Sequence, residues 1–128
     1  MKRVREQIEA YMRPGVSGDN RAVAEFSFPP EFIGFQGHFP TGSILPGACQ
    51  IQCLLTLLEH AGGKQLALKE IVLAKYMTPV MPAETIRCET SELPDFSGND
   101  TVVKAVITRD GQKVSELKIR VAAEVAGS

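Results

Sequence analysis

The sequence predicts an α+β domain in which one antiparallel sheet wraps around a central, mainly apolar helix. Residues 48–60 carry apolar side chains on most sides of a predicted helix, which is typical of a helix buried in a core. About four strand-like segments follow that helix along the chain. Because runs of strands with few helices favour antiparallel sheets, a single curved sheet around the buried helix is the simplest arrangement. The 128 residues are expected to form one domain, residues 1–128.

Two elements are predicted before the central helix. Apolar residues recur at helical spacing over residues 4–12, among charged ones, which indicates a short amphipathic helix that ends before Pro14. Residues 21–28 alternate instead, with Phe26 and Phe28 on the same face. This alternation predicts a strand with one buried side.

The central part of the chain begins with a long irregular stretch. Residues 31–47 contain six glycines and prolines, and loops of this length in compact domains tend to be functional. The helix over residues 48–60 follows, with Pro46-Gly47 before it and Ala61-Gly62-Gly63 after it as boundary signals. Its predicted apolar stripe consists of Ala48, Ile51, Leu54, Leu55 and Leu58, with Leu57 on the opposite side.

The rest of the chain is predicted to be β structure. Strands are expected over residues 70–77, 82–91, 101–108 and 113–123, with a turn-rich loop at 93–99. Ile86 and Cys88 alternate with polar neighbours, as in a strand with one buried face. The last two strands form a hairpin, because Asp110-Gly111 between them is a strong signal for a tight turn.

Composition and charge exclude several classes of function. Lys and Arg number 14 and Asp and Glu 15, so we expect no nucleic-acid partner and no membrane association. No apolar run approaches the roughly 20 residues of a membrane span, and no signal peptide is recognisable, which predicts a cytoplasmic location. Cys49, Cys53 and Cys88 are expected to be reduced thiols. No metal site is predicted, because His38 and His60 are the only histidines.

One stretch carries a specific chemical signature. Gly37-His38-Phe39-Pro40 is followed by Pro46-Gly47 and then by the predicted buried helix. This arrangement resembles the signature of the 3-hydroxyacyl-acyl-carrier-protein dehydratases of bacterial fatty acid synthesis. Residues 76–82, in which Pro79 and Pro82 bracket a strand turn, resemble a later segment of the same family. The resemblance covers nearly the whole chain and implies the hotdog fold of that family.

The resemblance also implies a substrate and an assembly. The family acts on 3-hydroxyacyl thioesters held on the phosphopantetheine arm of acyl carrier protein, in fatty acid, polyketide or pigment synthesis, and it needs no cofactor or metal. Two chains join edge to edge, so we expect a homodimer or a higher even oligomer with the active site at the interface. Acyl carrier protein is acidic, and a basic patch should face it. The candidates are Lys64, Lys69, Lys75 and Lys113.

The family's chemistry gives several residues a role. His38 occupies the position of the catalytic base, and a neutral imidazole can remove the proton from substrate carbon 2 near neutral pH. Gly47 would begin the helix with a free backbone N–H, which polarises the thioester carbonyl with help from the helix dipole. Phe39 and Ala48, their neighbours in the chain, are assigned to substrate binding by the same resemblance.

Gln52 departs from the family pattern, which has Glu or Asp at this position. A carboxylic acid can protonate the leaving hydroxyl, whereas an amide can only form a hydrogen bond to it, and general acid help is worth roughly 10²–10⁴-fold. His38 could perform both proton transfers, a water or another carboxylate could substitute, or the domain could bind acyl chains without dehydrating them. Glu59 lies roughly 10 Å farther along the helix, so we predict a solvated helix end there and not the missing acid.

Three functions stay open at this point. The first is a dehydratase-like hydro-lyase with His38 and Gln52 as catalytic residues. The second is a hotdog thioesterase, in which the amide of Gln52 would position water, although the Gly-His-Phe-Pro motif is foreign to thioesterases. The third is a catalytically silent acyl-binding or partner subunit, whose mate in a mixed dimer supplies the carboxylate. The sequence fixes neither the acyl chain length nor the pathway.

Overall fold

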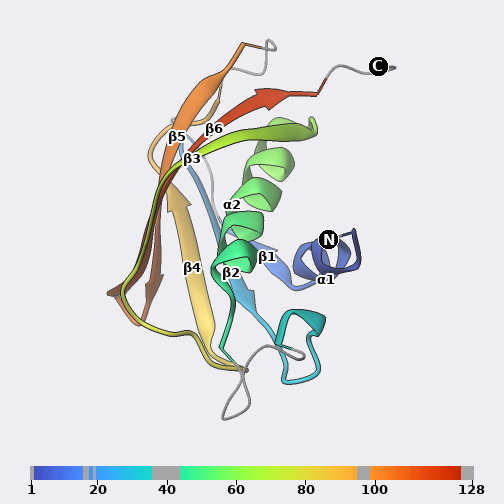
Figure 1. Ribbon diagram of the computed structural model, residues 1–128, viewed down its shortest axis with the longest axis vertical. Coiled ribbons are helices and arrows are strands. Elements are labelled where there is room, and N and C mark those ends of the chain that lie inside the picture. Colours follow the sequence, from blue (N-terminus) through green and yellow to red (C-terminus); the bar gives the residue numbers. More distant parts are fainter. Residues whose placement is uncertain (1, 16–17, 19, 36–43, 95–98, 125–128) are drawn as a thin grey trace.

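The computed structural model describes residues 2–15, 18, 20–35, 44–94 and 99–124 (Figure 1). The helices are α1 (Lys2–Ala10), the 3-10 helix η1 (Ile33–Phe35) and α2 (Gly47–Gly62). The strands are β1 (Met12–Pro14), β2 (Ala22–Ser27), β3 (Leu66–Tyr76), β4 (Thr85–Thr90), β5 (Thr101–Arg109) and β6 (Gln112–Ala123). One antiparallel sheet contains all six, in the order β1-β2-β4-β5-β6-β3. It curves around α2, which confirms the predicted α+β class and the wrapped central helix (Figure 1).

The ends of α2 lie within two residues of the predicted ones. Pro46 precedes the helix in an extended conformation, and Gly63 ends it with φ of 69°. The N–H of Gly63 donates to the carbonyl of Glu59, which closes the last turn in the left-handed geometry that glycine favours. Neither described α-helix is long and apolar enough to cross a membrane.

The buried side of α2 differs in part from the predicted stripe. Ala48 is exposed and Leu55 is only half-buried, so the prediction was wrong for these two residues. The buried side consists of Cys49, Gln50, Ile51, Cys53, Leu54, Thr56, Leu57 and Leu58. When a helix is apolar on most sides, the spacing of its apolar residues does not show which side faces the core. The sheet decides which side becomes the inner one.

The interior strands follow the predicted alternation. Every second residue of β2 is buried, starting at Ala22. In β4, Ile86 and Cys88 are buried whereas their neighbours are exposed or half-buried. The β5–β6 hairpin turns at Asp110 and Gly111, whose φ angles are 52° and 80°. Two successive positive φ angles are what a two-residue hairpin turn of type I′ requires, as the Asp-Gly pair predicts.

Both edges of the sheet differ from the prediction. β1 forms one edge, where the sequence predicted the tail of the first helix, because three residues are too few to show a strand period. β3 forms the other edge and begins at Leu66, four residues before its predicted start. Apolar side chains are exposed on β3 and just after it, at Leu68, Ile71, Val72, Leu73, Tyr76 and Met77. We call these residues the β3 edge strip. In the described part of the chain, the outer side of β3 pairs with no strand.

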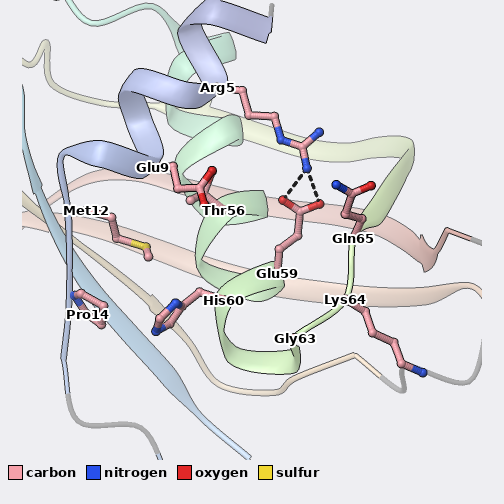
Figure 2. Close-up of a pocket in the computed structure, with 10 residues that line it drawn as sticks. All are labelled: Arg5, Glu9, Met12, Pro14, Thr56, Glu59, His60, Gly63, Lys64 and Gln65. Carbon is pink, nitrogen blue, oxygen red and sulfur yellow. Dashed lines mark hydrogen bonds and ion pairs between the residues drawn. The ribbon is translucent and has the colours of Figure 1, made fainter. Parts of the chain in front are cut away.

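A carboxylate ties α1 to the end of α2. Nη2 of Arg5 donates to both carboxylate oxygens of Glu59, at 2.9 Å each (Figure 2). Glu59 Oε2 also accepts the backbone N–H of Leu66 at 2.8 Å. The prediction of a solvated Glu59 is therefore wrong. Its side chain is largely buried and connects α1, α2 and the start of β3.

Replacing Glu59 with alanine should destabilise the fold. The Leu66 N–H and the Arg5 guanidinium lose their shared acceptor, so we expect Glu59→Ala to lower the free energy of unfolding by about 1–3 kcal/mol. Glu9 is exposed on α1, and Glu9→Ala should stay within about 0.5 kcal/mol of the wild type. Urea unfolding followed by circular dichroism measures both variants. Equal stabilities for the two would contradict the structural role of Glu59.

Candidate active site

The start of α2 presents backbone donors. The carbonyl of Pro46 accepts the N–H groups of Cys49 and Gln50, at 3.0 and 3.2 Å. Proline offers no side-chain cap, and no described residue accepts the N–H groups of Gly47 and Ala48. The first turn therefore has two donors available at the positive end of the helix dipole. This is the feature that the sequence predicted for Gly47.

Gly47 is in close contact with Tyr76, the last residue of β3. An ideal Cβ built on Gly47 would lie 2.5 Å from Cζ and 2.6 Å from the hydroxyl oxygen of Tyr76. Real Cβ atoms essentially never come within 3.0 Å of another heavy atom in this way, so only glycine fits unless the ring moves. Partial burial raises the pKa of Tyr76 above its usual value, and the hydroxyl stays protonated at neutral pH.

Gln52 lies on the outer side of α2, away from the concave sheet. It is half-buried, and its Nε2 donates to Oγ1 of Thr56 at 3.1 Å. Ala48, one turn earlier on the same side, is exposed. Glu59, two turns later on this side, contacts α1 through Arg5. The outer side of α2 is therefore covered by α1 near its end and open near its start.

The structure brings together three of the five predicted site residues. Gly47, Ala48 and Gln52 share the first two turns of α2, and the first and last of them are about 7.5 Å apart along the helix axis. His38 and Phe39 lie outside the described residues, so their predicted roles stay predictions. The three placed residues offer two backbone donors and one amide on a single open surface.

A buried polar contact, which sequence reasoning missed, fixes α2 on the sheet. The hydroxyl of Ser115 on β6 donates to Oε1 of Gln50 at 2.7 Å, and both residues are buried. A glutamine inside an apolar helix is a visible signal, because burial without a partner would cost about 1–3 kcal/mol. Its partner, Ser115, is 65 residues away in the chain, and nothing in the sequence around it indicates this hydrogen bond. Ser115 is also the β6 residue paired with Tyr76, so this contact lies next to the Tyr76–Gly47 contact.

The cysteines add no reactive group to the site. All three are free and buried, as expected for reduced thiols. Burial raises the pKa of Cys49 to about 11 and that of Cys88 to about 12. Burial and the neighbouring thiols raise the pKa of Cys53 as well. A thiol that stays protonated is a poor nucleophile and a poor metal ligand. Within the described ranges, no cluster of three or more His, Cys, Asp or Glu residues could hold a metal ion.

A pocket lies at the far end of α2, away from the predicted site residues. A pocket of about 500 Å³ opens between α1 and the last turns of α2 (Figure 2). Its lining includes Arg5, Glu9, Thr56, Glu59, His60 and Lys64. None of the five predicted site residues belongs to the described lining. Thr56, which accepts the hydrogen bond from Gln52, connects the pocket with the open start of the helix.

Comparison with known proteins identifies relatives by sequence. The family model of ApeI-like proteins, described as ApeI dehydratase, matches residues 15–117. The 3-hydroxyacyl-[acyl-carrier-protein] dehydratase FabZ of Clostridium novyi is 33% identical over 92 residues, which are 66% of this chain and 64% of that protein. FabZ of Chloroflexus aggregans is 36% identical over 86 residues, 61% of this chain and 56% of that protein. The chain thus spans less than two thirds of the length of these relatives.

Solved structures share the fold at lower identity. A chain of the dehydratase heterocomplex ApeI:P from Xenorhabdus doucetiae superposes with a TM-score of 0.73 at 20% identity, covering 86% of this chain and 94% of that one. A mutant thioesterase from Pseudomonas aeruginosa reaches 0.64 at 15% identity, covering 92% and 91%. These two likenesses show the fold alone, which is the predicted hotdog fold. The family model spans most of the sequence, and the chain therefore belongs to the ApeI-like dehydratase family.

Proposed function

We propose that the chain is a dehydratase-like enzyme that removes water from 3-hydroxyacyl thioesters carried by acyl carrier protein. The observation that carries the proposal is the open first two turns of α2. There Gly47 and Ala48 offer backbone N–H groups, and Gln52 offers an amide on the same side. Membership of a dehydratase family supports this chemistry. The FabZ relatives are named as acting on carrier-protein substrates, which supports the same substrate class here.

In the proposed reaction, His38 removes a proton from carbon 2 of the substrate. The electrons of that C–H bond form the double bond between carbons 2 and 3, and the C–O bond at carbon 3 breaks. The departing hydroxide takes up a proton and leaves as water. Negative charge develops on the thioester carbonyl during this step, and the N–H of Gly47 stabilises it at the positive end of the helix dipole.

Gln52 would hold the leaving hydroxyl and could not protonate it. One proton of its Nε2 is engaged by Thr56, and a second remains to donate to the substrate. The proton for the hydroxide must then come from His38, which took one from carbon 2, or from another group. A partner-subunit function is the alternative, because Gln52 stands where the resemblance implies an acid. The neighbouring ApeI:P structure is itself a dehydratase heterocomplex.

Substitutions at residue 52 separate these possibilities. If the site lacks only its acid, Gln52→Glu should raise the rate of dehydration by up to roughly 10²–10⁴-fold. Residue 52 is half-buried, and this partial burial would raise the pKa of the new carboxyl toward the range that a general acid needs. If His38 performs both transfers, Gln52→Ala should slow turnover and Gln52→Glu should not help. Gln65→Glu is the control, because it places the same charge at the far end of α2. It should leave the rate of dehydration unchanged.

The assay is incubation with a panel of 3-hydroxyacyl carrier-protein substrates, with mass detection of the loss of one water. His38→Ala should abolish turnover and leave the circular dichroism spectrum unchanged. Turnover by His38→Ala at the wild-type rate would overturn the assignment of the base. A wild-type chain that is inactive alone, and becomes active only when mixed with a hotdog dehydratase subunit that carries the carboxylate, is a partner subunit.

A dimer through the β3 edge strip is part of the proposal. An unpaired edge with apolar side chains is prone to association, and pairing two β3 strands would cover it. Two six-stranded sheets would then become one continuous sheet. Tyr76 belongs to this strip and contacts Gly47, so the start of α2 would lie beside the seam. The site would then be completed by the second copy.

A charge in the strip should weaken this dimer. Ile71 is 48% exposed on the edge strand, and Ile71→Lys would bring two like charges together across the seam. Val102 is 41% exposed on β5, which lies inside the sheet, so Val102→Lys is a matched control. Sedimentation velocity should show a dimer for wild type and Val102→Lys, and a shift toward monomer for Ile71→Lys. A wild-type monomer at micromolar concentration would exclude the dimer.

The structure divides the four candidate lysines for carrier-protein docking. Lys75 precedes Tyr76 in β3, and Lys113 precedes Val114, whose carbonyl accepts the N–H of Met77 at 2.8 Å. These two lysines lie at the end of the sheet where α2 starts. Lys64 lines the pocket at the opposite end of α2, and Lys69 lies in the first half of β3. We therefore assign Lys75 and Lys113 to the docking surface.

Charge reversal at residue 75 should affect only carrier-bound substrates. Each lost surface ion pair is worth about 0.2–1 kcal/mol, so Lys75→Glu should lower kcat/KM for carrier-bound substrate by roughly 2- to 10-fold, mostly through KM. The same acyl group on free pantetheine should react at the wild-type rate. Lys69→Glu is the control at the far end. Equal losses for Lys75→Glu and Lys69→Glu, or a loss with the pantetheine substrate, would contradict the assignment.

A further inference from the structure

Tyr76 lies over the start of α2 in close contact with Gly47. Its ring and hydroxyl occupy the space that a side chain at residue 47 would need. A Cβ at residue 47 would collide with the ring, so this close approach of the phenol requires glycine. At 45% exposure, the tyrosine is neither a core residue nor a freely solvated one. The contact therefore positions a phenol group at the helix end without burying it.

The hydroxyl of Tyr76 lies on the side of Gly47 that faces the free donors. In a helix the Cα–Cβ bond tilts toward the N-terminus, and the hydroxyl oxygen is 2.6 Å from where the Cβ of Gly47 would be. The N–H groups of the first turn also project past the N-terminus. The phenol and the two backbone donors therefore border the same space. The hydroxyl makes no hydrogen bond to any residue in the described ranges. Partial burial raises its pKa, so the phenol is protonated at neutral pH.

On the basis of the proposed dehydratase function, we propose that the Tyr76 hydroxyl is a further donor to the substrate's thioester carbonyl, beside the N–H of Gly47. The phenol keeps its proton throughout the reaction and shares it in a hydrogen bond. That bond strengthens as carbon 2 loses its proton and charge moves onto the carbonyl oxygen. A donor of this kind lowers the barrier because it favours the transition state over the bound substrate. Tyr76 would thus be a catalytic residue, a role that the resemblance does not assign to it.

The substitution that tests this removes one oxygen atom. Tyr76→Phe keeps the ring over Gly47, so folding and assembly should be unchanged by circular dichroism and sedimentation. Loss of one such donor costs about 10²–10³-fold in kcat in other enzymes, and we expect about 10²-fold here because the backbone N–H remains. KM should change little. Tyr11 is the only other tyrosine. Its ring packs edge-on against Phe28 and Phe32, and Tyr11→Phe keeps that ring, so kcat should stay within about 2-fold of the wild type.

A second measurement distinguishes donation from ring packing. In Tyr11→Phe, Tyr76 is the sole tyrosine, so growth on fluorotyrosine labels this position alone. Fluorine makes the phenol more acidic, and an ionised phenol is no longer a donor. The alkaline limb of the kcat profile should therefore move to lower pH in the labelled protein. If the Tyr76 ring only packs against Gly47, the alkaline limb of the kcat profile should not move.

The outcomes separate this inference from the proposed function. If the wild type dehydrates a substrate and Tyr76→Phe does so with the same kcat, the role of Tyr76 is overturned and the dehydratase function stays intact. If no substrate is dehydrated, the proposed function fails. The placement of Tyr76 at an acyl-binding site is then tested by ligand binding, followed by tyrosine fluorescence. The chain has no tryptophan, so the fluorescence of Tyr11→Phe reports Tyr76 alone. A saturable change with an unreactive 3-hydroxyacyl-pantetheine amide would place Tyr76 at the acyl site, and no change would overturn that placement.

Discussion

The burial of α2 inside the concave sheet is the constraint on which the rest of the structure depends. Leu54 and Leu58 are fully buried, and a helix this apolar cannot remain in water. One polar bond, from Ser115 to Gln50, fixes how the helix sits within the apolar contact. Apolar packing alone tolerates small rotations of a helix, whereas a buried hydrogen bond does not. The position of Gly47 against the sheet follows from this placement.

The inner and outer sides of α2 therefore make different contributions to the structure. The inner side supplies the core, and the outer side divides along its length. Near the end of the helix, Glu59 holds α1 and the start of β3. Near the beginning, Ala48 is exposed and Gln52 is half-buried. The same buried helix thus fixes the backbone donors of the proposed site rigidly, with the exposed Ala48 beside them. Donors that are fixed before the substrate arrives need no reorganisation during the reaction.

Tyr76 connects this site with the edge of the sheet. Its backbone ends β3, its side chain contacts Gly47, and it belongs to the β3 edge strip. In the proposed dimer, the seam and the site would share this residue, so assembly and catalysis would depend on each other. The Gln52 amide cannot protonate a leaving hydroxyl, so in the proposed mechanism that proton comes from His38 or from a group of a partner chain.

The sequence by itself determined the order of the two α-helices and of the strands other than β1, the buried alternation of β2 and β4, the hairpin at Asp110-Gly111 and the ends of α2. These features depend on neighbours in the chain, through side-chain period and backbone φ preference. The motif likewise predicted Gly47, Ala48 and Gln52 as site residues, and all three share the first two turns of α2.

Only the tertiary structure decided which side of α2 faces the sheet, why residue 47 must be glycine, and that Glu59 is a structural anchor. Each of these depends on a partner distant in the chain: the curved sheet, Tyr76, or Arg5. The bond between Gln50 and Ser115 is another such case, since its partners are 65 residues apart. Periodicity reports only that a residue prefers to be buried. The residue it meets there is set by the folding of the whole chain, which brings distant segments within hydrogen-bond reach.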